Sequence, residues 1–181
     1  RHLERLRDIA LEGPYALVFP SVRVMHSSEA GLEQIREYDL DRLLGRHKTR
    51  FSLNRAIVKH YGVSHQFYGM FDLELLPELD RLVESQVDLC CFNEGVPLHW
   101  VHSRCDTAYA GDIWFCYVTS DQQLSRSSRS RDMLCDMLRY TARVARVYLC
   151  SGYSPWQKIV MLVTLTPIHA RAVCARGSSS E

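Results

Sequence analysis

The longest regular pattern of apolar and polar positions lies between Ser130 and Pro155. Its buried-face positions recur at alternating spacings of four and three residues, which is the period of a broad amphipathic helix. Ser130 is predicted to cap this helix, and Gly152 is predicted to end it in a left-handed conformation just before Pro155. A helix of about 20 residues is about 30 Å long, so we expect the other elements to pack against it. The buried-face positions are Leu134, Met137, Leu138, Thr141, Val144, Ala145, Val147 and Tyr148.

Helical periods of the same kind predict shorter helices elsewhere in the chain. They cover residues 1–12, 52–62 and 72–85, and a further helix is predicted from Ser27 or Ser28 to Gly45. Residues 154–166 are expected to form another helix, because Ser154 and Gln157 have the spacing of a capping box. The β-branched composition of this last segment leaves a strand as the alternative.

Three other regions have the composition and alternation of β-strands. Residues 15–19 and 21–25 flank Pro20, and a proline favours an edge strand or a bend because it lacks a backbone donor. Residues 87–92 and 96–102 flank Asn93-Glu94-Gly95 and are predicted to form a hairpin, with residues 112–120 as a further strand. The sequence therefore predicts an α+β fold, mainly helical, with a small antiparallel sheet.

Composition narrows the class of protein. The 181 residues, 46% of them apolar, fit one globular domain, which we place at residues 15–169 with a flexible tail at 170–181. A net charge of +1 gives no general attraction to nucleic acid or anionic lipid. The sequence shows neither a membrane span nor a signal-peptide pattern, and its seven cysteines suggest reduced, buried thiols. Because the chain begins at Arg1 within a helical pattern, we expect a piece of a longer protein.

A group of cysteine and histidine residues raises two chemical alternatives. Cys91, His99, His102 and Cys105, with Cys90 beside them, could supply zinc ligands. The same residues could form a thiol nucleophile and its base. Against both readings, two histidines three residues apart on one strand would point to opposite faces, and the sequence marks no oxyanion hole. The chain also lacks a glycine-rich phosphate loop, so we expect neither a nucleotide enzyme nor a cofactor.

Arginines recur on one face of the helix predicted from Ser130. They are Arg139, Arg143 and Arg146. A basic stripe of this kind can follow the phosphate backbone of RNA, which would make the chain a binder of small RNA. The alternative is the solvated face of an amphipathic helix, and the balanced net charge favours that alternative.

The first fourteen residues have a spacing that resembles a known motif. Leu3 is followed by ten residues and then by Pro14. This resembles the end of the F-box-like motif of the P-zero proteins of poleroviruses, which reads Leu-Pro-x-x-Leu, then ten to thirteen residues, then Pro. The Leu-Pro pair would precede Arg1. Residues 69–74 and 151–155 are similar to two later segments of that family.

The resemblance implies a non-enzymatic viral suppressor of RNA silencing. Proteins of this family act in the host-cell cytoplasm or nucleus, where they recruit an SKP–cullin ubiquitin ligase to ARGONAUTE and promote its degradation. Residues 1–14 would be the tail of the F-box-like motif, and Leu3, Leu6, Ile9 and Pro14 would contact the SKP-type adaptor. For Leu6 and Ile9 the alternative is packing on the chain's own core. ARGONAUTE would meet the remaining domain, at the arginine face or near Trp100, and a homodimer stays open.

Overall fold

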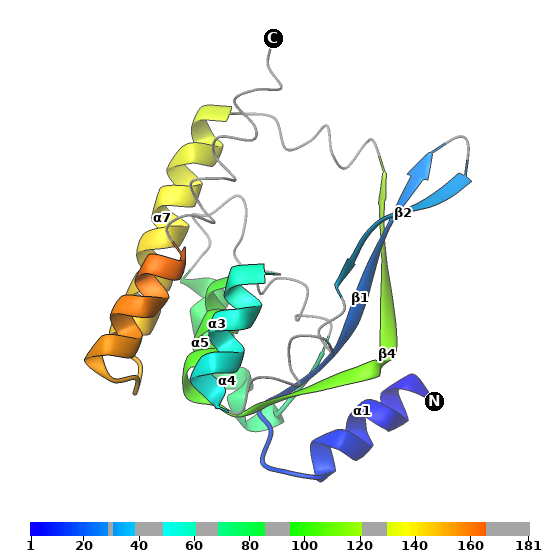
Figure 1. Cartoon of the computed structure of the whole chain (residues 1–181), viewed down its shortest axis with the longest axis horizontal. Helices are drawn as coiled ribbons and strands as arrows, with labels where there is room; N and C mark the ends of the chain where they lie inside the picture. Colours follow the sequence, from blue (N-terminus) through cyan, green and yellow to red (C-terminus); the bar gives the residue numbers. More distant parts are fainter. Residues whose placement is uncertain (29–30, 39–48, 61–68, 86–94, 121–129, 166–181) are drawn as a thin grey trace.

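A computed structural model of the chain describes residues 1–28, 31–38, 49–60, 69–85, 95–120 and 130–165. A four-stranded sheet lies between helix α1 (His2–Leu11) on one face and a group of helices on the other (Figure 1). The predicted α+β class is confirmed. The sheet is mixed, however, and not purely antiparallel as predicted.

Strand β1 (Leu17–Ser28) forms the centre of this sheet. It pairs in parallel with β4 (Thr107–Ser120) on one side. On the other side it pairs antiparallel with β3 (Met70–Phe71) near its start and with β2 (Gly31–Tyr38) toward its end. Leu17 and Phe19 belong to the core under the helices, whereas Val18 between them belongs to the core under α1. The period-two alternation of one strand therefore supplies both cores.

Pro20 lies within this central strand, so of the two alternatives predicted for it, an edge strand or a bend, the edge strand is wrong. Pairing with β3 involves Leu17 and Val18, and pairing with β2 begins only at Val22. Toward β4 the register shifts between Pro20 and Ser21. The missing backbone donor of the proline thus falls between two antiparallel ladders and interrupts neither of them.

Residues 31–38 form strand β2, so the helix predicted from residue 27 or 28 to residue 45 is wrong over this segment and over the end of β1. Residues 29–30 and 39–45 lie outside the described residues. Pairing with the second half of β1 overrides the helix propensity of the charged side chains in the segment. Charged residues are also typical of a strand at the edge of a sheet, where they discourage pairing with other chains. Gly31 has a φ of 120°, which other residues rarely adopt.

Helix α5 (Gly95–Arg104) replaces the second arm of the predicted hairpin, which is therefore wrong. Residues 86–94 lie outside the described residues. All of α5 except Trp100 and Arg104 is buried. A helix enclosed on most sides has no polar face, so its apolar run is easily read as a strand. A Cβ at Gly95 would lie 2.5 Å from the Tyr140 hydroxyl oxygen, so the glycine allows α5 to begin close to the long helix.

The remaining predicted helices are confirmed within the described residues. They are α1, α3 (Arg50–His60), α4 (Leu76–Glu84) after a 3-10 turn at Leu73–Leu75, α7 (Ser130–Leu149) and a helix over residues 155–165. The capping box is present in the last of these. The Ser154 N–H donates to Gln157 Oε1 at 3.0 Å, and the Gln157 N–H donates to Ser154 Oγ at 3.3 Å. Among the helices that the structure describes, none combines the length and apolar composition needed to cross a membrane.

The end of α7 differs from its prediction. Gly152 does not have a positive φ, so it is not the left-handed stop that we expected. Instead the Ser151 hydroxyl donates to the Tyr148 carbonyl at 2.6 Å, which satisfies one of the terminal carbonyls of the helix. The chain then turns and runs back along α7 as residues 155–165 (Figure 1). Val144 and Tyr148 of α7 pack with Met161 in the main core, where none of the three has measurable exposure.

Candidate functional site

Helix α1 packs on the sheet by one face only. Leu6 and Ile9 lie against Val18, Ala110 and Ile113, and the two side chains are only 5% and 9% exposed. Two of the four residues predicted to contact an adaptor therefore belong to the chain's own core, which was the alternative left open for them. Their burial fixes α1 to the sheet.

Leu3, Leu11 and Pro14 lie on the accessible part of this region. Leu3 is 72% exposed and Leu11 is 78% exposed. Arg5 links the helix to β4, because its Nε donates to Asp112 Oδ2 at 3.1 Å. The predicted contact set is thus divided into buried residues that hold the helix and exposed residues that another protein can reach.

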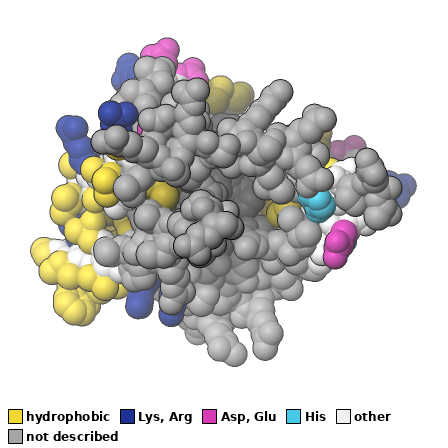
Figure 2. Space-filling model, turned by 90° about the horizontal axis from the view of Figure 1, so that it is seen from above, with side chains coloured by type: hydrophobic (Ala, Val, Ile, Leu, Met, Phe, Trp, Pro, Cys, Tyr) yellow, Lys and Arg dark blue, Asp and Glu magenta, His cyan; other side chains and the backbone are white. Residues whose placement is uncertain are grey.

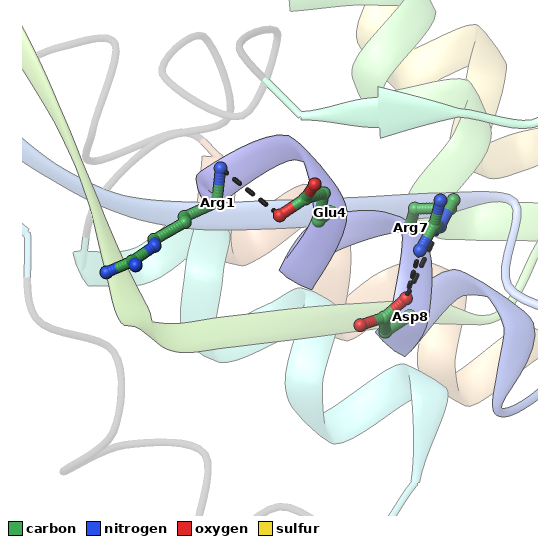
Figure 3. Close-up of polar contacts among 4 residues, drawn as sticks. All are labelled: Arg1, Glu4, Arg7 and Asp8. Atoms are coloured by element: carbon green, nitrogen blue, oxygen red, sulfur yellow. Dashed lines mark hydrogen bonds and ion pairs between the residues drawn. The ribbon is translucent and has the colours of Figure 1, made fainter.

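Other charged groups of α1 pair with close neighbours in sequence (Figure 3). The guanidinium of Arg7 lies 3.0 Å from Asp8 Oδ1, and the backbone nitrogen of Arg1 lies 3.4 Å from the Glu4 carboxylate. An exposed ion pair such as Arg7–Asp8 contributes less than about 1 kcal/mol. These pairs leave Leu3 uncovered.

The three arginines predicted to form one face of α7 have different surroundings. Arg139 is exposed and pairs with Asp136 at 3.8 Å. Arg143 and Arg146 line a pocket of about 420 Å³, to which α5 contributes Arg104. The helical periodicity of α7 predicted that its arginines share one face. It could not show that α5 places a further arginine, Arg104, beside them. The basic stripe is therefore divided between an ion pair on the surface and a concave site.

A chain of polar side chains runs through the main core and joins α3, α5 and α7. His99 lies 2.7 Å from the Tyr148 hydroxyl through Nδ1 and 3.1 Å from the Tyr140 hydroxyl through Nε2. The Tyr148 hydroxyl donates to Asn54 Oδ1 at 3.3 Å, and Asn54 Nδ2 donates to the Tyr153 hydroxyl at 3.0 Å. Because buried polar groups are costly without partners, this network favours one arrangement of the helices.

The direction of these bonds fits a neutral imidazole. Burial raises the pKa of Tyr148 well above its ordinary value, so the phenol keeps its proton and donates it to Asn54. His99 then donates from Nδ1 to Tyr148 and accepts at Nε2 from Tyr140. Both ring nitrogens of His99 are engaged, which leaves neither of them directed at a metal ion.

The zinc and thiol readings receive no support from the described residues. His99 and His102 lie one turn apart on α5 and not on a strand as expected. In the part of the chain that the structure describes, no group of three or more histidine, cysteine or acidic side chains could hold a metal ion. Cys90 and Cys91 lie outside that part. Burial raises the pKa of the Cys105 thiol, which disfavours the thiolate that a nucleophile needs.

His102 is a second enclosed imidazole with a different environment. The side chain is 1% exposed, and its ring meets Phe19 edge-on at a centroid distance of 5.8 Å. Its Nδ1 lies 3.4 Å from the Thr107 hydroxyl. Burial lowers the pKa of His102 from 6.5 to about 4, so the ring is neutral at physiological pH.

The helix over residues 155–165 exposes an apolar stripe. Trp156, Ile159 and Val163 follow one another at helical spacing on its outer face, whereas Met161 and Leu165 are buried. Figure 2 shows apolar side chains gathered on the side of the molecule where α7 and this helix lie, with basic side chains beside them. The sequence predicted the helix but not its outer face, because apolar residues occupy both faces.

Comparison of the chain with protein-family models, with curated proteins and with solved structures found no match. The likeness to the P-zero proteins therefore rests on the residues quoted above.

Proposed function

We propose that this chain is a suppressor of RNA silencing that acts as an F-box-like adaptor. In this proposal it recruits an SKP–cullin ubiquitin ligase to ARGONAUTE, in the host cytoplasm or nucleus, and promotes ARGONAUTE degradation. The observation that carries the proposal is the exposure of Leu3 on a helix fixed to the sheet. The spacing from Leu3 to Pro14, both of which are accessible, supports it further.

The packing of α1 gives its residues separate roles in this proposal. An exposed leucine on a short helix can enter a hydrophobic groove of a partner. Leu6 and Ile9 do not contact the partner but hold α1 in place, so that little conformational freedom is lost on binding. Arg5 contributes to the same attachment through Asp112. The proposal therefore assigns adaptor contact to Leu3 and Pro14, and attachment to the buried residues.

A binding measurement with a longer chain tests the proposal. The chain is extended upstream by a Leu-Pro pair placed directly before Arg1, so that Arg1 and His2 are the two variable residues of the motif. The affinity of this extended chain for a plant SKP-type adaptor is measured by calorimetry. We expect a complex that Leu3→Ala weakens by about tenfold or more, because a buried interface anchor commonly contributes over 1 kcal/mol. Pro14→Ala is expected to weaken it as well.

Leu11→Ala is the matched control, because Leu11 is equally exposed on the same helix but lies outside the motif positions. We expect it to bind like the unchanged chain. The same variants are then expressed in plant cells, where ARGONAUTE abundance should fall with the unchanged chain and with Leu11→Ala but not with Leu3→Ala. A folded, extended chain that forms no complex with the adaptor would refute the proposal.

A further inference from the structure

The pocket of about 420 Å³ lies where the end of α4, helix α5 and the second half of α7 meet. Its volume falls in the range of sites for small molecules and is too small for a nucleic-acid duplex. Among the described residues that line the pocket, three are arginines, namely Arg104, Arg143 and Arg146, and none is acidic. A concave site with three guanidinium groups selects an anionic ligand.

The arginine from α5 has a fixed position. Its Nη2 donates to the Cys150 carbonyl at 2.9 Å, and its guanidinium lies over the Trp100 ring at 5.4 Å from the centroid. Arg50 Nη1 donates to the carbonyl of Arg104 itself at 2.6 Å. Because these contacts hold Arg104 and Trp100 together, charge and aromatic surface adjoin each other in the pocket.

The other walls of the pocket are largely apolar. Val96 of α5 and Val147 of α7 line it beside Trp100, and both valines belong to the buried core. A small inorganic anion would bind the arginines but would leave the apolar surface of the pocket exposed to water. The site therefore suits a ligand with a charged end and a flat or apolar body.

We propose that this pocket binds a nucleoside monophosphate. Guanidinium groups match the geometry of a phosphate through paired hydrogen bonds, and an aromatic side chain offers a face on which a base can stack. The phosphate meets Arg143 and Arg146, and the base lies along Trp100 and the valines. A free nucleotide and the terminal nucleotide of a phosphorylated strand share this chemistry. The site lies apart from α1, so it does not depend on the proposed adaptor function.

Tryptophan fluorescence gives a direct measurement of this binding. The chain has three tryptophans, so a Trp114→Phe/Trp156→Phe variant reports on Trp100 alone. Titration with adenosine monophosphate at low salt is expected to quench this signal. Adenosine and inorganic phosphate, each carrying half of the ligand, are expected to bind at least about tenfold more weakly. Calorimetry with the unchanged chain repeats the titration without any tryptophan substitution.

Two arginine variants and a matched control locate the site. Arg143→Gln and Arg146→Gln are each expected to weaken adenosine monophosphate binding by about tenfold or more, because each removes a charge-assisted contact. Arg81→Gln is the control, since Arg81 is an exposed arginine on α4 that pairs with Glu78 and does not line the pocket. Its affinity should match that of the unchanged chain.

A comparison of free adenosine monophosphate with trinucleotides phosphorylated at the 5′ or 3′ end separates the two sources of the ligand. Tighter binding of one phosphorylated trinucleotide assigns the site to a strand end, and tighter binding of the free form assigns it to a metabolite. The proposal is overturned if the folded chain shows no binding at millimolar nucleotide, or if adenosine binds equally well. It is also overturned if both arginine variants bind normally, or if a phosphopeptide binds where nucleotides do not.

Discussion

We expect His102 to make the stability of this protein depend on pH. The imidazole is enclosed in the core between α5 and the sheet, where burial lowers its pKa from 6.5 to about 4. In the unfolded chain the same side chain takes up a proton near pH 6.5. Between these two values the unfolded state binds more protons than the folded state, so acid favours unfolding.

The magnitude follows from the two pKa values. They differ by about 2.5, which at about 1.4 kcal/mol per pKa unit corresponds to about 3.5 kcal/mol of stability. This contribution is fully present above about pH 6.5 and is lost as the pH falls toward about 4. At about pH 5.5 we expect a loss of about 1.4 kcal/mol, and at about pH 4.5 a loss of about 2.5 kcal/mol.

Urea denaturation of the unchanged chain and of His102→Gln, followed by circular dichroism between about pH 7.5 and 4.5, measures this effect. Glutamine has a similar size and does not titrate, so the variant loses the His102 part of the pH dependence while other groups keep theirs. As the pH falls across this range, we expect the unfolding free energy of the unchanged chain to decrease by about 2.5 kcal/mol more than that of His102→Gln. Parallel curves would show that His102 does not remain neutral in the folded protein.

Three further changes, two in the core and one at a helix cap, are tested by urea denaturation. Tyr148→Phe removes the hydroxyl that contacts His99 and Asn54, and should destabilise the fold by about 1–3 kcal/mol because it leaves buried partners unsatisfied. Leu98→Ala, at a side chain with no exposure, should cost about 2–5 kcal/mol, and a smaller loss would mean that α5 is less enclosed. Ser154→Ala removes half of the capping box and should cost about 1 kcal/mol. A Tyr148→Phe variant as stable as the unchanged chain would contradict the network.

The sequence predicted the elements whose signals are local. The four-and-three spacing of α7 and the capping box at Ser154 both specify a helix without reference to the rest of the fold. Prediction from the sequence failed where strand pairing or burial in the folded chain decides which element forms. Residues 31–38 have the charged composition of a helix but form a strand because β1 offers them a partner. Helix α5 is enclosed, so it lacks the polar face that would have identified it.

The candidate sites show the same limit. Sequence spacing predicted Leu3 and Pro14 as contact residues, which stays a prediction. It left the burial of Leu6 and Ile9 undecided, because that burial depends on packing against residues of the sheet such as Ile113. It also identified the arginines of α7 but not the pocket, which needs a third arginine from α5. Distances along one helix are encoded locally, whereas a concave site depends on which helices meet.

The sheet separates the two surfaces to which we assign function. Val18 packs under α1, and its neighbours Leu17 and Phe19 pack under the helices that form the pocket. Helix α1, with its exposed leucine, and the helices that carry the pocket arginines therefore pack on opposite faces of the sheet. Neither site contributes a side chain to the other. Substitution effects at sites without shared partners are usually additive. Loss of adaptor binding in a Leu3 variant thus reports on α1 alone, and loss of nucleotide binding in an Arg143 variant reports on the pocket alone. Failure of one proposal leaves the other standing on its own measurements.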